Sequence, residues 1–353
     1  MNPRHRRRIP AAVVLAGVLA AAVLAAAVLA GCGGSSSSTG GAGAGSITVY
    51  SGQHQQTATT LTNDFRARTG ISVNLRSSDE AALANQILHE GGDSPADVFY
   101  AENPPALTVL SHQGLLAPTD PTTLAKVPTR YDSPRRDWVG VSARSAVLVY
   151  NTGEVTTAAL PASLTDLAGP AWKGRIGFAP TETDFQPLIA ALVKLRGQAA
   201  AKSWLDGLKS NGKVYDDNET LVAAVNRGDV AAGLIDHYYW YRLRDEVGAA
   251  KVRSALHYFA PADPGALVDV SGAAVLKSSH HAAAAQRFLA YLVSPPAQEI
   301  IARSESYEYP LGSGVTTAKP LRPFSELRPP AVGIDDLGDG RASLMLLQQV
   351  GLI

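Results

Sequence analysis

Short β-branched runs alternate with helical segments after residue 46, and this alternation constrains the fold more than any other feature of the sequence. Ile47–Tyr50 and Ile71–Leu75 have the composition of strands, and the segment between them carries apolar residues at helical spacing until Gly70. Because a strand, a helix and a second strand form a βαβ unit, the pattern predicts an α/β architecture with mixed, mainly parallel sheets.

The same alternation continues along the chain. Ser77 and Glu80 have the spacing of a capping box, which predicts a helix that begins there and ends at Gly91. Further strands are predicted at Asp97–Tyr100, Val147–Tyr150 and Arg175–Phe178, and further helices at Ala106–Gln113, Phe185–Leu195, Ala199–Leu208, Thr220–Arg227 and Ala282–Leu292. About 300 residues are more than one hydrophobic core normally serves, so we expect two lobes.

The composition excludes several classes of protein. Lys and Arg number 31 and Asp and Glu number 31, so the chain has no excess positive charge to offer a nucleic-acid backbone. The single Cys excludes disulfide frameworks, thiolate zinc sites and iron-sulfur clusters. A metal site with two or more thiolate ligands is therefore excluded.

The N-terminus has the pattern of a signal sequence. Four Arg precede an apolar run at residues 9–30, and the ending Leu29-Ala30-Gly31-Cys32 resembles the lipobox of bacterial lipoproteins. This predicts a signal peptide at residues 1–31, a lipidated Cys32 and a Gly/Ser-rich tether at residues 32–46. An uncleaved membrane anchor is the alternative, since the run is long enough to span a bilayer. Either interpretation places the rest of the chain outside the cytoplasm.

Cleavage at that site would change the charge balance. It removes four Arg and no acidic residue, which leaves the mature chain with four more acidic than basic residues. We therefore expect a mildly acidic mature protein.

The motifs of common enzyme classes are missing from the sequence. It has no nucleophile elbow, phosphate-binding loop, dinucleotide fingerprint or two-His helical zinc motif. The eight His residues show no metal-ligand spacing among themselves, and His280 and His281 are expected at a solvated helix start. The sequence therefore predicts that the chain is not an enzyme.

Four aromatic residues occupy consecutive positions, Tyr238 to Tyr241, in a chain that is 7% aromatic. Three interpretations are open from the residues alone. The rings could form part of a core or interface, since Tyr and Trp bury a large area and keep a polar group. They could stack on a sugar or an organic cation. Their phenolate oxygens could instead ligate a hard, highly charged ion such as Fe(III).

The run Ile235–Leu243 resembles the adjacent-tyrosine motif of bacterial ferric-ion-binding proteins, the solute receptors of iron(III) ABC transporters. Further segments resemble the same family and occur in the family's order, namely Val49–His54, Ser94–Glu102, Trp172–Gly177, Asp263–Val268 and Ser271–Leu276. The resemblance extends from about Ile47 to the C-terminus. Several separate motifs in order are more specific than one.

The resemblance implies four iron ligands, which are His54, Glu102, Tyr238 and Tyr239. One carboxylate and two tyrosinates supply three negative charges, which balance Fe(III) in a cleft of low dielectric. A tyrosine has an ordinary pKa of about 10, so the cation must make the loss of its proton favourable. Iron binding should then release protons and weaken in acid.

Members of this family often complete the iron shell with an exogenous anion such as carbonate, phosphate or citrate, held at a Ser/Gly-rich helix start. Here the corresponding segment is Ala179–Gln186, and it departs from the family pattern because it contains Glu182 and Asp184. Two carboxylates repel an anion that a helix N-terminus would otherwise attract. We expect Glu182 to ligate iron or to displace the anion; the alternative is a capping box made by Thr183 and Gln186.

Two more residues are candidates for the same anion or extra-ligand site, together with Glu182 and Thr183. Arg144 resembles a family position that faces the bound anion, with a surface ion pair as the alternative. Asn218 could line the pocket, with a helix cap before Thr220 as the alternative. His237 lies beside the tyrosines, at a family position that is polar without being a ligand.

The fold implied is the periplasmic-binding-protein type II fold, which has two α/β lobes, crossover strands and a ligand cleft between the lobes. We expect residues 47–145 and 270–320 in lobe 1, which supplies His54 and Glu102. Residues 146–269 and 321–353 are expected in lobe 2, which supplies the two tyrosines. Only closure then completes the metal shell.

The resemblance also implies the partners. The chain would be a monomeric lipoprotein that its lipid alone holds to the cell membrane. It would deliver ferric ion or a ferric chelate to a permease and its ATPase. The alternatives are a binding protein for a polyamine or organic anion, with the aromatic run as a stacking wall, and a secreted hydrolase or transferase that uses a Glu and a His.

Overall fold

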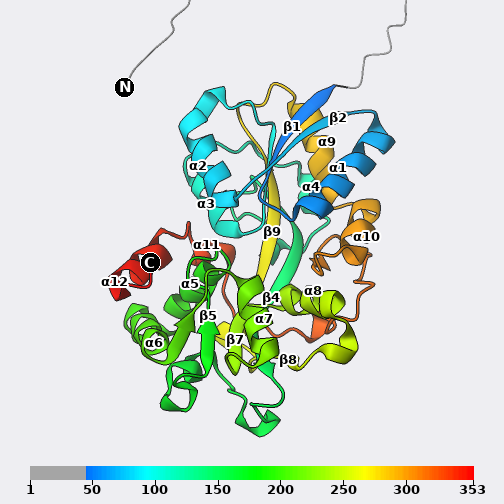
Figure 1. Cartoon of the computed structure of the whole chain (residues 1–353). Coiled ribbons are helices and arrows are strands. Elements are labelled where there is room, and N and C mark those ends of the chain that lie inside the picture. Colours follow the sequence, from blue (N-terminus) through cyan, green and yellow to red (C-terminus); the bar gives the residue numbers. More distant parts are fainter. Residues whose placement is uncertain (1–44) are drawn as a thin grey trace, which may run out of the picture. The chain divides into compact units, whose positions relative to one another are not determined.

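The computed structural model describes residues 45–353 (Figure 1). The predicted signal peptide, Cys32 and all but the end of the predicted tether lie outside the described residues. The strands are β1 (Ser46–Ser51), β2 (Ser72–Ser77), β3 (Val98–Ala101), β4 (Val139–Asn151), β5 (Ile176–Phe178), β6 (Gly212–Val214), β7 (Ala232–Asp236), β8 (Ser254–His257), β9 (Val268–Val275) and β10 (Tyr309–Pro310).

The helices follow the strands in the expected alternation. They are α1 (Gln55–Thr69), α2 (Glu80–Glu90), α3 (Pro104–His112), α4 (Pro121–Leu124), α5 (Phe185–Arg196), α6 (Gln198–Asn211), α7 (Asn218–Arg227), α8 (His237–Val247), α9 (Ala282–Leu292), α10 (Pro295–Arg303), α11 (Ile334–Leu337) and α12 (Arg341–Val350). The predicted α/β architecture is confirmed. No helix within residues 45–353 combines the length and the apolar character needed to cross a membrane.

The strands form one mixed sheet in the order β2-β1-β3-β9-β4-β7-β5-β6, and β8 and β10 pair with β4. Parallel pairs occur at the two ends of this order, between β1 and its neighbours and between β5 and its neighbours. The pairs in the middle, which involve β4 and β9, are all antiparallel. The expectation of a mainly parallel sheet is therefore wrong, because two crossover strands of opposite direction occupy its centre.

Strand β4 changes its partners half-way along its length. Residues 139–145 pair with β9, whereas residues 146–151 pair with β7 and β8. Strand β9 also pairs with β3, and its residues Gly272–Val275 lie antiparallel to Val98–Ala101. These two strands therefore join the two halves of the sheet (Figure 1), as expected for crossover strands. The residue boundaries given above for the lobes stay a prediction.

Two clusters of buried apolar side chains support the two halves. One surrounds Phe65, Phe99 and Phe288, and it extends to the aromatic residues of α8. The other surrounds Phe178 and Trp204 and includes apolar residues of the C-terminal helix α12. The C-terminal segment thus packs on α5 and α6 (Figure 1).

The helix starts differ from the predicted caps. Asp79 caps α2, since its side chain accepts a hydrogen bond from the backbone N–H of Ala82 at 2.8 Å, while Ser77 lies in β2. The capping box expected from Ser77 and Glu80 is therefore wrong. The alternative considered for Thr183 and Gln186, a capping box, is also wrong, because the N-cap of α5 is Asp184 and it makes no side-chain cap bond.

Candidate metal centre

The predicted ligands lie on three segments, each of which directly follows a strand. His54 is the N-cap residue of α1 and follows β1, and Glu102 follows β3. Since β1 and β3 are parallel neighbours, their carboxyl ends meet at the same edge of the sheet, where ligands bind in α/β folds. Tyr238 and Tyr239 lie in the first turn of α8, directly after β7.

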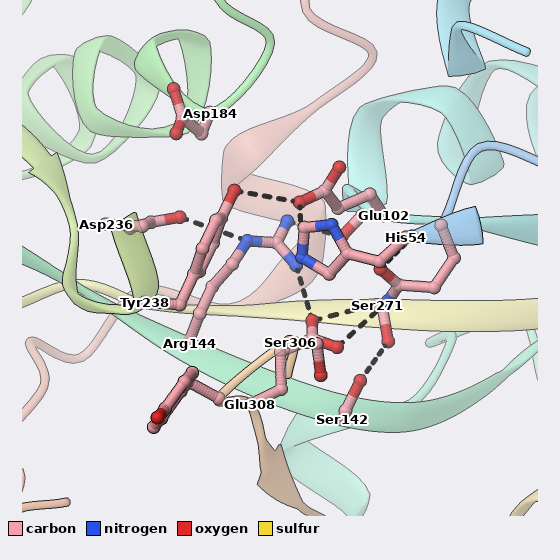
Figure 2. A network of polar contacts seen from close by, with 12 residues as sticks. His54, Glu102, Ser142, Arg144, Asp184, Asp236, Tyr238, Ser271, Ser306 and Glu308 are labelled. Atoms are coloured by element: carbon pink, nitrogen blue, oxygen red, sulfur yellow. Dashed lines mark hydrogen bonds and ion pairs between the residues drawn. The ribbon is translucent and has the colours of Figure 1, made fainter. Parts of the chain in front are cut away.

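His54, Glu102 and Tyr238 lie within contact distance of one another, as Figure 2 shows. The Tyr238 hydroxyl donates to Oε1 of Glu102 at 3.0 Å, and Nε2 of His54 lies 3.6 Å from the same oxygen. The rings of His54 and Tyr238 meet edge to face, with centroids 5.0 Å apart. Nε2 of His54 is buried and has no hydrogen-bond partner within the described residues. The Nε2 of His54, a carboxylate oxygen of Glu102 and the phenol oxygen of Tyr238 thus face one point.

Tyr239 lies against Tyr238, with ring centroids 4.2 Å apart. Both side chains are buried, with 1% and 8% of their surface exposed. Burial, followed by the charge of Glu102, raises the pKa of Tyr238 well above its ordinary value. Burial and Asp184 do the same for the pKa of Tyr239. Both phenols are therefore neutral at ordinary pH, and a strong cation that stabilises the phenolates is needed to displace their protons to the solvent.

The burial of the aromatic run leaves little ring surface for a stacked ligand. Tyr241 stacks on Tyr307 at 5.3 Å, and the indole N–H of Trp240 donates to Ser254 at 3.1 Å. Tyr238 and Tyr239 cover each other. The run is thus partly core, and the phenol oxygen of Tyr238 faces Glu102.

Two carboxylates line the side of the site that faces α5. The backbone N–H of Asn218 donates to Glu182 at 3.2 Å, and its amide donates to both oxygens of Asp184, at 3.2 and 2.9 Å. Burial raises the pKa of Glu182 to about 7 and raises that of Asp184 well above its ordinary range. Asn218 is the first residue of α7 and not its cap, since Asp217 caps that helix.

Thr183 contacts the Glu102 loop and does not cap its own helix. Its hydroxyl oxygen accepts a hydrogen bond from the amide of Asn103 at 3.1 Å. The contact joins the residue after Glu102 to the segment that carries Glu182, so the two loops meet across the site.

Arg144 is fully buried on β4, so the surface ion pair considered above is wrong. Its Nε lies 3.1 Å from Oδ2 of Asp236, and its Nη1 lies 3.4 Å from Oε1 of Glu308. Its Nη2 donates to the backbone carbonyl of Glu102 and to the amide oxygen of Asn103 (Figure 2 shows the surroundings of Arg144). The guanidinium that was expected to face an anion is therefore already bound by oxygen atoms of the protein itself.

Four buried acids around this site were not predicted from the sequence as part of it: Glu80, Asp236, Asp269 and Glu308. Burial raises the pKa of Glu80 and of Asp236 to about 7, and that of Asp269 to about 6. Asp236 and Asp269 stand out in retrospect, because each interrupts or ends an apolar strand. The sequence carries no comparable signal for Glu308.

His237 uses both ring nitrogens within the protein. Its Nδ1 accepts from the backbone N–H of Ser145 at 3.1 Å, and its Nε2 lies 2.8 Å from the carbonyl oxygen of Tyr307. Burial lowers the pKa of His237 to about 3, so the ring is neutral and Nε2 carries the proton. No nitrogen of His237 is left to bind a metal.

Within residues 45–353, no three His, Cys, Asp or Glu side chains are grouped so that they could hold a metal ion. His54 and Glu102 contribute only two ligands of these types. A metal at this centre therefore requires the tyrosine oxygens.

Comparison with known proteins gives the family. The protein-family model described as "Bacterial extracellular solute-binding protein" matches residues 93–332. The chain belongs to this family. It is also 41% identical over 311 residues to the major ferric iron-binding protein of Neisseria meningitidis serogroup B, covering 87% of this chain and 93% of that protein. It is 38% identical over 307 residues to the Fe(3+)-binding periplasmic protein of Serratia marcescens, with 87% and 90% covered.

Solved structures agree with this assignment to the solute-binding family. Iron-bound HitA from Pseudomonas aeruginosa matches with a TM-score of 0.82 and 45% identity, over 87% of this chain and 99% of that one. IdiA (FutA) from Trichodesmium, in complex with iron and citrate ligands, matches with a TM-score of 0.78 and 31% identity, over 87% and 99%. The predicted two-lobed type II fold of periplasmic binding proteins is confirmed.

The raised pKa of Glu182 predicts a pH dependence of stability. The folded protein keeps this proton up to a pH of about 7, whereas the unfolded chain releases it near 4.5. The free energy of unfolding therefore falls as pH rises through this window. In metal-free Glu182→Gln, we expect the melting temperature to fall less between pH 5 and pH 8 than in the wild type.

Glu305→Gln is the control, because Glu305 is exposed and lies outside the site. Thermal unfolding followed by circular dichroism at several pH values measures the difference. An identical pH slope in Glu182→Gln and the wild type would contradict the prediction.

Proposed function

We propose that this chain captures Fe(III) in the cleft between its lobes and delivers it to the permease of an ABC transporter. One observation carries the proposal: His54, Glu102 and Tyr238 converge on one point from segments that are far apart in the sequence. The similarity to proteins named as ferric iron-binding supports the same metal.

The donor set matches the chemistry of Fe(III). Glu102 and the two tyrosinates supply three negative charges and hard oxygen donors, and neutral His54 adds a nitrogen. These charges balance the ion in a site from which water is largely excluded. Because both phenols are protonated without a cation, iron binding releases protons and its affinity falls in acid.

Closure of the two lobes completes the shell. We assign residues 47–145 and 270–320 to the lobe that supplies His54 and Glu102, and residues 146–269 and 321–353 to the lobe that supplies the tyrosines. Since β4 and β9 cross between the halves of the sheet, they are the elements about which the lobes would move. Iron then favours the closed form, because only closure brings all four ligands to it.

The iron site of this chain works without a synergistic anion. Glu182 and Asp184 place carboxyl oxygens where carbonate or phosphate would bind, and Arg144 is already paired with carboxylates. We propose that Glu182 ligates the iron or occupies the position of the anion. Asn218 and Thr183 hold the neighbouring groups in place, through Asp184 and Asn103 respectively.

The chain acts outside the cytoplasm as a monomeric lipoprotein. Its lipid on Cys32 and the tether at residues 32–46 hold the folded part near the membrane, where the permease and its ATPase receive the iron. The chain itself catalyses no reaction, and the energy for transport comes from the ATPase.

Removing either tyrosine oxygen tests the ligand set. We expect Tyr238→Phe and Tyr239→Phe each to weaken Fe(III) binding by orders of magnitude, because each loses an anionic donor. Titration with ferric citrate, followed by the tyrosinate-to-iron absorption in the visible range, measures the loss. Tyr241→Phe is the matched control on the same helix, since Tyr241 stacks on Tyr307. If wild-type protein gives no visible band with Fe(III), the proposed function is wrong.

The acidic segment predicts independence from phosphate. The affinity of the wild type for Fe(III) should be the same with and without added phosphate, whereas Glu182→Ala should bind iron more tightly when phosphate is present. The physical reason is that the variant loses a carboxylate that repels the anion. Competition with a chelator at both phosphate concentrations measures this, and a strong phosphate requirement in the wild type would overturn the proposal.

The lipid anchor predicts where the protein is found in cells. The wild type should partition with the membrane fraction and leave it in detergent, whereas Cys32→Ala should not be lipidated. Mass spectrometry of the mature N-terminus and fractionation of cells measure both effects. A wild-type chain without lipid on Cys32 would contradict the assignment.

A further inference from the structure

Glu80 is a buried carboxylate beside the metal centre that the proposed chemistry does not use. It is the first residue of α2 and is only 5% exposed. Its Oε2 accepts hydrogen bonds from the backbone N–H groups of Glu102 and Asn103, at 2.9 and 2.8 Å. Its Oε1 accepts from the amide of Asn103 at 2.5 Å. Both oxygens therefore bind the loop that carries the predicted ligand Glu102.

Arg144 holds the opposite side of the same loop. It donates to the carbonyl of Glu102 and to the amide oxygen of Asn103. The N–H groups of the loop thus bind Glu80 and a carbonyl binds Arg144, so the backbone of the loop is held from both sides. The Glu102 carboxylate takes part in neither contact, and it faces Tyr238 and His54.

The same glutamate also supports the loop that carries His54. A Cβ atom added to Gly52 would lie 2.3 Å from Cβ of Glu80, so Gly52 packs directly on this residue. The N–H of Gly52 donates to the carbonyl of Tyr100 at 2.8 Å, which ties the loop to β3. His54 lies two residues further on. Glu80 therefore contacts both ligand-bearing loops of this half of the site.

We infer that Glu80 is a positioning residue of the iron site, which aims the Glu102 carboxylate at the point that His54 and Tyr238 also face, without touching the metal. This inference rests on the proposed function. Groups that orient metal ligands by hydrogen bonds commonly change metal affinity by about 10- to 100-fold when they are replaced. Glu80 thereby sets how tightly Fe(III) is held and how fast it is released.

Glu80→Gln tests the positioning role with little change of shape. Its amide has one oxygen, so its NH2 group must face either the backbone N–H groups of the loop or the amide of Asn103. Asn103 cannot turn to compensate, because its oxygen accepts from Arg144. We expect Fe(III) affinity to fall by about 10- to 100-fold, measured by competition with citrate and by the visible band.

Asp79→Asn is the matched control for loss of charge. Asp79 is the adjacent residue, exposed, and it caps α2, which Asn also does well. This variant removes one negative charge beside Glu80 and leaves the Glu102 loop intact, so it should bind iron like the wild type. Glu80→Asp gives the converse test, since it keeps the charge but withdraws both oxygens by one methylene. A positioning role requires that it also weaken binding.

A double-mutant cycle separates positioning from a general structural role. If Glu80 acts through Glu102, the loss caused by Glu80→Gln should become much smaller in a Glu102→Gln background, because the group it aims is gone. Equal losses in both backgrounds would overturn the inference. So would wild-type affinity in Glu80→Gln, or equal losses in Glu80→Gln and Asp79→Asn.

Iron binding by the wild type and the folding of each variant are measured alongside the affinities of the variants. If the wild type itself does not bind Fe(III), the proposed function fails; if it binds and the Glu80 variants bind equally well, only the positioning role fails. Circular dichroism checks that each variant folds. If neither Glu80 variant folds, Asn103→Ala decides, because it removes the bond to Oε1 of Glu80, and unchanged iron affinity in it would overturn the inference.

Discussion

The buried guanidinium of Arg144 organises the centre of this molecule. A buried charge is costly unless it is paired, and Arg144 meets this condition with Asp236 and Glu308 as well as with the backbone of the Glu102 loop. It lies on β4 two residues before Ala146, where that strand exchanges β9 for β7. One side chain thus connects the Glu102 loop, the start of the tyrosine-bearing helix α8 and the crossover of the sheet.

Negative groups exceed positive ones around this guanidinium. Asp236, Asp184 and Glu182 have raised pKa values because burial and neighbouring carboxylates penalise their charged forms. A trivalent cation relieves this repulsion, whereas an added anion would increase it. If the proposed function holds, these acids would favour a bare, highly charged metal over a metal that arrives with its own phosphate or carbonate.

Much of the local structure was predictable from the sequence. The spacing of apolar residues and Gly70 located α1, and the predicted range of α9 agrees with its observed bounds. The direction of the central strands was not predictable, because it depends on partners far away in the sequence. The helix caps at Asp79 and Asp184 were also misassigned, since several polar residues at a helix start compete for the same role and packing decides between them.

The sequence by itself determined the kinds of donor that the site has. A single Cys leaves oxygen and nitrogen ligands, and the resemblance of the tyrosine run to a known family pointed to His54, Glu102, Tyr238 and Tyr239. Only the tertiary structure decided which groups aim those donors. Glu80 and Glu308 lie far from the tyrosines along the chain; the sequence around Glu80 indicates only a helix start, and the sequence around Glu308 gives no signal. Burial and pairing give them their roles, and these depend on contacts that no local sequence pattern encodes.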